Sequence, residues 1–235
     1  MRQFKSVVVI NGVAYRRHLV KTHFVQAGED WAQVIRMYAS NLLKEGMIIT
    51  LSESAVASSQ GRAIPISQIK PSLLARLLWR FVRKVPYGIG LRSPYSMEMA
   101  IRECGALRVL IAAIIGGALR MLGIRGVFYR IAGKQAAMID AAGTSPLYPD
   151  RVVLGPRKPD ETAESISRAL NGLPVAIVDV NDIGGSWVVG ASSNISSSLR
   201  KTIEEVLRDN PAGQGDELMP IVIIEPIQSD IMLMR

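Results

Sequence analysis

Short apolar runs separated by polar turns recur along the chain, a pattern typical of a fold that combines strands with helices. Asn11 and Gly12 stand between two such runs and predict a β-hairpin, because both central residues of the tightest turns need a positive φ. Further strands are predicted at 47–51, 127–131, 136–139, 151–154, 175–180, 187–189 and 221–224.

Apolar positions three or four residues apart predict the accompanying helices. One begins at Asp30 and is expected to end at Gly46, since glycine commonly follows the last helical residue. An apolar helix at 109–119 is expected to break or bend at Gly116 and Gly117. Other helices are predicted from Pro71, from Ser93, at 161–170 and at 196–208. The pattern therefore combines strands with helices, and the length of 235 residues allows one large domain or two small ones.

Basic residues are concentrated in the middle of the chain. Thirteen Lys or Arg but only two acids, Glu98 and Glu103, lie between Arg62 and Lys134, while the whole chain carries a net charge of +8. Such a segment suits an anionic partner: a polyphosphate, an anionic substrate, a membrane surface or nucleic acid. Charge alone does not choose among these partners.

The helix predicted from Pro71 opens the basic helical segment at about 70–125. Its apolar positions include Leu73, Leu77 and Phe81, and its arginines lie largely on the other side. This pattern favours an amphipathic helix packed on the domain, with a basic face toward solvent, over a helix that lies on a membrane surface.

The number of cysteines gives an expectation about the cellular compartment. The chain has one cysteine, Cys104, which cannot form an internal disulfide, so a reducing compartment is the simplest interpretation. The N-terminal residues do not have the pattern of a signal peptide. We therefore expect a cytoplasmic protein.

Two acidic segments are candidates for chemistry. Asp179 ends an apolar strand, and Asp182 follows shortly before glycines, an arrangement that suits a hard cation, although one aspartate capping a turn would give the same pattern. Gly213, Gln214, Asp216 and Glu217 precede the strand at 221–224 and offer further oxygen ligands. A helix end followed by a solvated turn is the alternative interpretation of this second segment.

Three segments, in the same order, resemble the factor-420 γ-glutamyl ligase family. They are the run from Gly213 to Glu217 before an apolar strand, the early strand-and-turn element that ends at Gly61-Arg62, and the strand that ends at Asp179. The resemblance spans most of the chain and is weakest from about Lys70 to Arg125. It implies the α+β fold of that family, with mixed sheets and packed helices, and a single domain over 1–235.

The resemblance also implies a chemistry. Ligases of this family use GTP with Mn²⁺ or Mg²⁺ to convert a carboxylate into an acyl phosphate, which the amine of glutamate then attacks. On this interpretation Asp179 and Gln214 are metal ligands, with Asp182 and Asp140 as further candidates. The residues expected to contact the nucleotide, GTP or ATP, are Gly213, Gln214, Asp216, Glu217, Ser58 and Arg62. The family also implies a homodimer, and no nucleic acid is expected as a partner.

The sequence departs from the family pattern in several places: Val180 stands where the ligases have a threonine after the aspartate, and their following Gly-Arg-Pro-Trp-Arg run is absent. Ser58 stands where the ligases carry a lysine that contacts phosphate, and Ser145 aligns with a metal-binding aspartate, for which Asp140 is a nearby substitute. The leading hypothesis is a nucleotide- and metal-dependent ligase that joins glutamate, or a similar amino acid, to a carboxylate acceptor. The alternatives are a folate-type γ-glutamyl ligase, a catalytically silent nucleotide-binding or interaction protein of the same fold, and a peripheral membrane protein.

Overall fold

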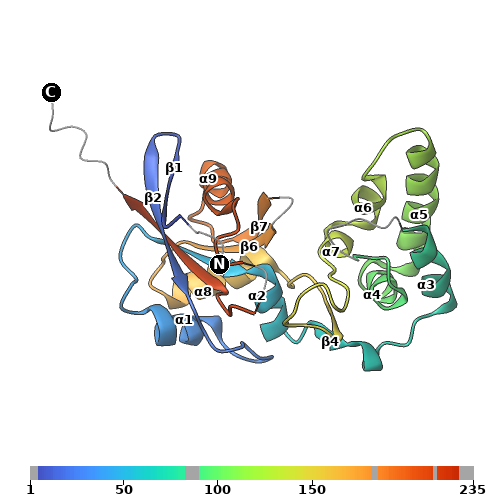
Figure 1. Cartoon of the computed structure of the whole chain (residues 1–235), viewed down its shortest axis with the longest axis horizontal. Coiled ribbons are helices and arrows are strands. Elements are labelled where there is room, and N and C mark those ends of the chain that lie inside the picture. The colour runs from blue at the N-terminus through green and yellow to red at the C-terminus, as the bar shows by residue number, and fades with distance from the viewer. Residues whose placement is uncertain (1–4, 83–89, 182–184, 214–215, 228–235) are drawn as a thin grey trace. The chain divides into compact units, whose positions relative to one another are not determined.

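The computed structural model describes residues 5–82, 90–181, 185–213 and 216–227 (Figure 1). Contacts divide the chain into two compact units. Unit 1 combines residues 1–60 with 156–235, and unit 2 consists of residues 61–155. The single domain expected over 1–235 stays a prediction.

Unit 1 is built on a curled, mixed, six-stranded sheet with the strand order β1-β2-β8-β3-β6-β7. Only β3 and β6 are parallel, and the other neighbours are antiparallel. The strands are β1 (Val7–Ile10), β2 (Val13–Val20), β3 (Ile48–Ser52), β6 (Val175–Asn181), β7 (Gly185–Ala191) and β8 (Ile221–Ile227). The predicted hairpin at Asn11 and Gly12 is confirmed, and both residues have positive φ.

The central strands are buried on both faces, which explains why they are continuous apolar runs. In β6, Ile177 belongs to one hydrophobic cluster, and its neighbour Val178 belongs to the cluster on the other face. The same alternation separates Ile223 from Ile224 in β8. Successive side chains of a strand point to opposite faces, so such a strand needs cover on both sides.

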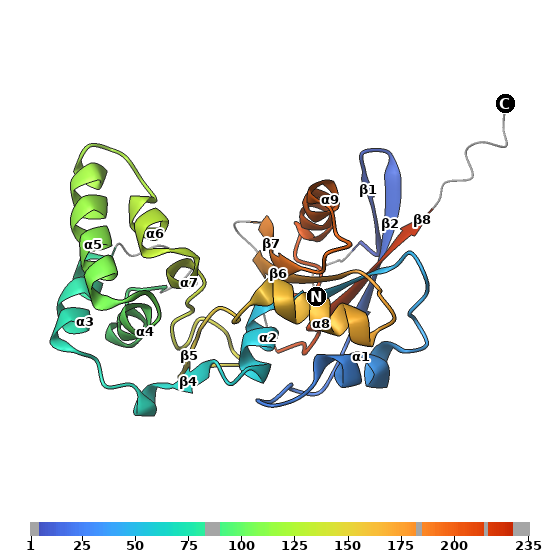
Figure 2. The same cartoon turned by 180° about the vertical axis from the view of Figure 1, so that it is seen from behind.

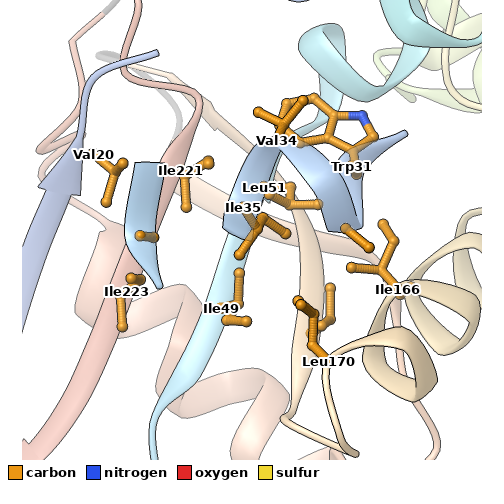
Figure 3. Close-up of a cluster of buried hydrophobic side chains, with 14 of the residues drawn as sticks. Val20, Trp31, Val34, Ile35, Ile49, Leu51, Ile166, Leu170, Ile221 and Ile223 are labelled. Atoms are coloured by element: carbon orange, nitrogen blue, oxygen red, sulfur yellow. The ribbon is translucent and has the colours of Figure 1, made fainter. Parts of the chain in front are cut away.

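Helices provide that cover. The first cluster packs the sheet against α1 (Trp31–Ala39), α2 (Glu53–Ser59) and α8 (Pro159–Ala169), and it includes Val56 of α2. Figure 3 shows Ile35 of α1 and Ile166 of α8 in this cluster. On the opposite face α9 (Ser197–Leu207) contributes Ile203 and Val206 (Figure 1). Unit 1 therefore has three layers, with the sheet in the middle.

The first helix is shorter than its apolar spacing predicts. The Asp30 side chain accepts a hydrogen bond from the Ala32 N–H, which confirms the predicted start, but α1 ends at Ala39. The expected end at Gly46 is wrong. Leu42 and Leu43 pack against the core from the turn after the helix, so the apolar periodicity continues where the helix has stopped.

Unit 2 is mainly helical and has a hydrophobic cluster of its own (Figures 1 and 2). A two-stranded sheet pairs β4 (Ala63–Pro65) with β5 (Arg151–Val153). The helices are α3 (Leu73–Leu78), α4 (Pro94–Cys104), α5 (Ala106–Met121), α6 (Val127–Ala132) and α7 (Lys134–Ala137), with 3₁₀ turns η1 (Ile66–Gln68) and η2 (Trp79–Phe81). Ser93 caps α4, and Pro94 follows in its first turn, as predicted.

Two predicted strands are helices instead. The segment predicted as a strand at 127–131 forms α6, and most of the one predicted at 136–139 belongs to α7 or the residue after it. Packing against α5 outweighs the strand preference of the aromatic and β-branched residues in α6. A side-chain carbon at Gly116 would lie 3.0 Å from the backbone nitrogen of Phe128, so glycine lets the two helices approach closely. The expected break at Gly116 is wrong, because α5 is continuous there.

The helix predicted from Pro71 differs in its start and in its buried face. It begins at Leu73 with Ser72 as its cap, and the Ser72 hydroxyl accepts a hydrogen bond from the Ala75 N–H. Ala75 and Leu78 are buried, whereas Leu73 is 85% exposed. The exposed stripe is therefore partly apolar, which the sequence pattern did not predict.

Among the described residues, no single helix is both long and apolar enough to cross a membrane. Helices α4 and α5 follow each other with a bend of 115° between them. Taken together as one segment, they are long and apolar enough by length and composition. Met97, Met99 and Ala100 of α4 belong to the core of unit 2.

Candidate functional site

Three chain segments meet at one edge of the six-stranded sheet. Strands β3 and β6 run parallel, with Ser52 aligned to Val178, so both end at the same edge. Strand β8 runs the other way and begins there, with the Ser52 N–H donating to the Pro220 carbonyl at 2.8 Å. We call residues 52–54, 179–181 and 216–220 the carboxyl edge. In open α/β sheets, ligands commonly bind outside the carboxyl ends of the strands.

Asp179 lies at this edge, directly after the four buried residues of β6, and is half-buried. It follows Val175 and Ile177 on the face that α1, α2 and α8 cover. Burial raises the pKa of the Asp179 carboxyl above its usual range, because the charged form loses hydration. A nearby cation would favour the charged form and lower this pKa.

Trp187 of β7 is the residue directly opposite Asp179 in the antiparallel pair β6–β7. Directly opposed residues of such a pair point to the same face, so the indole and the carboxylate are neighbours. Trp187 is 45% exposed, an unusual state for so large an apolar side chain. From the sequence, position 187 is predicted only to lie in a strand. Its position opposite Asp179 depends on the β6–β7 register, which the sequence does not give.

Glu53 is a second acid at the edge, and it is not among the residues predicted from the sequence to bind metal or nucleotide. Ser52 of β3 is aligned with Val178 of β6. Glu53 is the next residue after Ser52, just as Asp179 is the next residue after Val178. It is 7% exposed and opens α2. The signal that could have found it is an acid immediately after a buried parallel strand.

The predicted residues Gly213 and Glu217 lie against each other. A side-chain carbon on Gly213 would be 2.7 Å from Glu217 Oε1, and Gly213 has φ +78. Glu217 and its neighbour Asp216 are exposed. Leu218 has φ +54, a region that bulky residues seldom occupy, and the Thr22 N–H donates to its carbonyl at 2.9 Å. The start of β8 is thus held to the end of β2.

Two other residues predicted to contact the nucleotide, Ser58 and Arg62, lie at buried positions. Ser58 is buried in the second half of α2, so the expected early turn is a helix at this point. Arg62 belongs to unit 2 and is 3% exposed. Its guanidinium donates to the Gly155 carbonyl at 2.5 Å and to Glu103 at 2.6 Å, so internal partners occupy it. Contact of either residue with a nucleotide stays a prediction.

The other candidate metal ligands are placed as follows. Asp140 is an exposed residue of unit 2 whose backbone pairs with Val153, at 2.8 Å from the Asp140 nitrogen to the Val153 oxygen. Asp182 and Gln214 lie outside the described residues. Within the described ranges, no three His, Cys, Asp or Glu residues form a group that could hold a metal ion.

A shallow, open depression of about 490 Å³ also lies in unit 1. The residues around it come from the loop before α1, the end of α2 and the start of α8, and they include Arg157, Lys158, Glu29 and Glu161. Gln60 spans part of this region, because its amide exchanges two hydrogen bonds with the backbone of Arg157. None of the residues predicted to bind metal or nucleotide lines the depression.

The fold is α+β, and its mixed sheet brings acids from separate segments to one edge. A family model described as F420-0:gamma-glutamyl ligase matches residues 19–192, which is most of the chain. The chain therefore belongs to the F420-0:gamma-glutamyl ligase family, and the resemblance seen in its motifs is confirmed. Ligase activity is the general activity of that family. The match includes Glu53 and Asp179 and ends before Gly213. A comparison with curated proteins found no match.

Proposed function

We propose that the protein is a nucleotide- and metal-dependent ligase that joins glutamate, or a similar amino acid, to a carboxylate acceptor through an acyl phosphate. One observation carries the proposal: Asp179, Glu53 and the segment 216–220 come from three separate parts of the chain and meet at the carboxyl edge. Membership of a ligase family supports amide-bond formation as the type of reaction.

Asp179 suits a divalent cation as one ligand. Carboxylate oxygens are the preferred ligands of Mg²⁺ and are also bound by Mn²⁺. A cation would compensate the burial that now raises the pKa of this carboxyl. In the proposal Asp182 and Gln214 complete the ligand set from the neighbouring segments. The chemistry that the cation would supply is neutralisation of charge on the transferred phosphate.

Trp187 offers an exposed aromatic surface beside Asp179. Every nucleobase has a flat π-face, and stacking on an aromatic side chain typically contributes about 1–3 kcal/mol. We propose that Trp187 stacks on the base of the nucleotide, whose phosphates then extend toward the metal ligands. Gly213, Asp216 and Glu217 would line the same nucleotide site.

The proposed reaction has two steps. An oxygen of the acceptor carboxylate attacks the γ-phosphorus of GTP, the bond to the β-phosphate oxygen breaks, and GDP leaves. The amine of glutamate then attacks the acyl carbon, phosphate leaves with the electron pair of the C–O bond, and the amine loses a proton. The chain's own contribution is to hold the reactants in line and to exclude water from the acyl phosphate.

The test is the thermal stability of the purified protein with GTP, GDP or ATP, each with and without Mn²⁺. A ligand that binds only the folded state adds about 2.7 kcal/mol at 100 times its Kd. We expect a metal-dependent stabilisation by GTP that Asp179→Asn removes and Trp187→Ala weakens by about tenfold in Kd.

The matched control is Glu45→Gln, which removes one negative charge from an exposed position of the same unit. It should retain the full stabilisation. No stabilisation by any nucleotide would reject the ligase proposal. A nucleotide could stabilise the protein while no carboxylate acceptor in a panel gives glutamate-dependent phosphate release. That result would identify a catalytically silent nucleotide-binding protein.

A further inference from the structure

Helix α5 is apolar on two sides, and unit 2 covers only one of them. Val109 and Ala112 are fully buried and belong to the core of unit 2. Another stripe consists of Leu107, Ile111, Ile114 and Met121, at spacings of four, three and seven residues, which keep it on one side of a helix. The exposed fractions of these four residues, in that order, are 70%, 41%, 63% and 85%.

Other large apolar side chains of unit 2 are exposed as well. Leu122 after α5 is 75% exposed, and Leu73, Leu77 and Phe81 form a second exposed stripe along α3 and η2. A surface helix of a globular protein normally turns polar residues to solvent, so apolar residues on both sides indicate a missing partner.

Exposed arginines lie close to these stripes in the sequence, and the same part of the chain has no exposed acid. Arg120 and Arg125 flank Met121 and Leu122, Arg130 lies on α6, and all three are exposed. The two acids between Arg62 and Lys134 are both engaged internally. Glu98 accepts from Arg102 at 2.9 Å and Glu103 from Arg62 at 2.6 Å. A partner that accepts an apolar stripe and carries negative charge therefore suits this part of the chain.

We propose that the exposed side of α5 docks on the surface of a membrane that contains anionic lipids. Helices with an apolar stripe and flanking arginines lie in the plane of such a surface, with the stripe in the acyl region and the cations at the headgroups. The 16 residues of α5 extend about 24 Å, which is shorter than the hydrocarbon core of a bilayer of about 30 Å. Helix α5 accordingly rests on the bilayer and does not cross it.

A second copy of the chain fits this surface less well. In a symmetric dimer the same patch occurs on both partners, so arginines would face arginines across the contact. The sequence from 104 to 139 contains no Asp or Glu with which a partner copy could compensate them. Like charges placed together in this way oppose association.

The experiment is sedimentation of the full-length protein with vesicles of phosphatidylcholine alone and of phosphatidylcholine mixed with phosphatidylglycerol, at low and at high salt. We expect binding only to the mixed vesicles, and much weaker binding at high salt. The variant that carries Leu107→Ser, Ile114→Ser and Met121→Ser should bind at least about 100-fold more weakly. Loss of three charges, by Arg120→Gln, Arg125→Gln and Arg130→Gln, should also weaken binding about 100-fold.

Matched controls separate these effects from general changes in charge or apolar surface. Val9→Ser with Met37→Ser removes exposed apolar side chains from unit 1, and Lys21→Gln, Lys44→Gln and Lys201→Gln remove three exposed charges there. Both controls should bind as the parent does, and all variants should keep its melting temperature because the changed residues are exposed. Failure to bind mixed vesicles, or equal binding to phosphatidylcholine alone, would overturn the proposal. The proposal would also be overturned if the protein forms a dimer that the α5 serine substitutions dissociate, and if it does not bind vesicles.

Discussion

Helices α8 and α5 use their apolar residues in different ways. In α8, Ala163 and Ile166 are buried in a core cluster of unit 1, and the acids Asp160 and Glu161 occupy the exposed first turn. In α5, burial of Val109 and Ala112 leaves a full second stripe of apolar residues in contact with solvent. The folded chain thus accounts for the hydrophobic pattern of unit 1, while in unit 2 the pattern contains more apolar residues than the fold buries.

The largest expected difference between the two regions is the loss of unfolding free energy when one isoleucine in each is changed to alanine. Ile49 of β3 is fully buried, so Ile49→Ala should lower the free energy of unfolding by about 3.5 kcal/mol. Ile114 of α5 is 63% exposed, so Ile114→Ala should change it by less than about 0.5 kcal/mol. Urea denaturation of the two variants measures both values. Equal losses would mean that the α5 stripe is a buried core surface and would break the comparison.

The next largest effect concerns a buried ion pair. Arg62 donates to Glu103 and to the Gly155 carbonyl inside unit 2, so Arg62→Ala should cost about 2 kcal/mol. Arg168→Ala is the matched control, because Arg168 is an exposed arginine that pairs with Glu164 one helical turn away. It should cost less than about 0.5 kcal/mol. Weaker nucleotide binding by Arg62→Ala at unchanged stability would instead support the nucleotide contact predicted from the sequence.

A smaller effect depends on pH. Glu98 accepts from the Ser72 N–H at 2.9 Å and from Arg102, and thereby ties the start of α3 to α4. Burial by itself raises the pKa of Glu98, but these hydrogen bonds and the charge of Arg102 outweigh it, so the net pKa is below its usual value of 4.5. Glu98→Gln should cost about 1.5 kcal/mol at neutral pH.

The sign of the pH dependence follows from the lowered pKa. The unfolded chain takes up a proton on Glu98 more readily than the folded chain does, so the carboxylate stabilises the fold fully above about pH 4.5. This contribution is lost as the pH falls through the lowered pKa of the folded state. The stability difference between the parent and Glu98→Gln should therefore shrink in acid. A difference that is independent of pH would show that Glu98 acts through packing alone.

A smaller loss of stability than at Glu98 is expected at Gln60, in unit 1. Its amide accepts from the Arg157 N–H at 2.7 Å and donates to the Arg157 carbonyl at 3.2 Å. Gln60→Ala removes these two hydrogen bonds and a third, which the amide donates to the Thr162 hydroxyl at 3.2 Å. The position is partly exposed, so the change should cost about 1 kcal/mol. Chemical denaturation checks this, and a loss as large as that of Ile49→Ala would contradict it.

Elements with a local sequence signal were predictable. The hairpin at Asn11 and Gly12, the caps at Asp30 and Ser93 and the apolar strands of the central sheet are all confirmed. Each of these signals acts within a few residues of the chain. Segments whose structure depends on distant packing were predicted wrongly, as the helix α6 at 127–131 and the unbroken helix at Gly116 show.

The candidate site was predictable only in part, for the same reason. Asp179, Asp216 and Glu217 could be selected because acids stand next to apolar strands in the sequence. Their assembly at one edge, and the addition of Glu53 and Trp187, depend on strand order and register. A single sequence does not determine that order, so Trp187 could not be found from it. Glu53 has the same local signal as Asp179, an acid that closely follows an apolar strand.

Hydrogen exchange of the backbone amides, with and without GTP and Mn²⁺, tests the central claim most directly. If the carboxyl edge binds the metal and the nucleotide, exchange should slow at residues 52–54, 179–181 and 216–220 and stay unchanged along α5. This protection should be absent in Asp179→Asn. Unchanged exchange at the carboxyl edge, or protection confined to unit 2, would contradict the account.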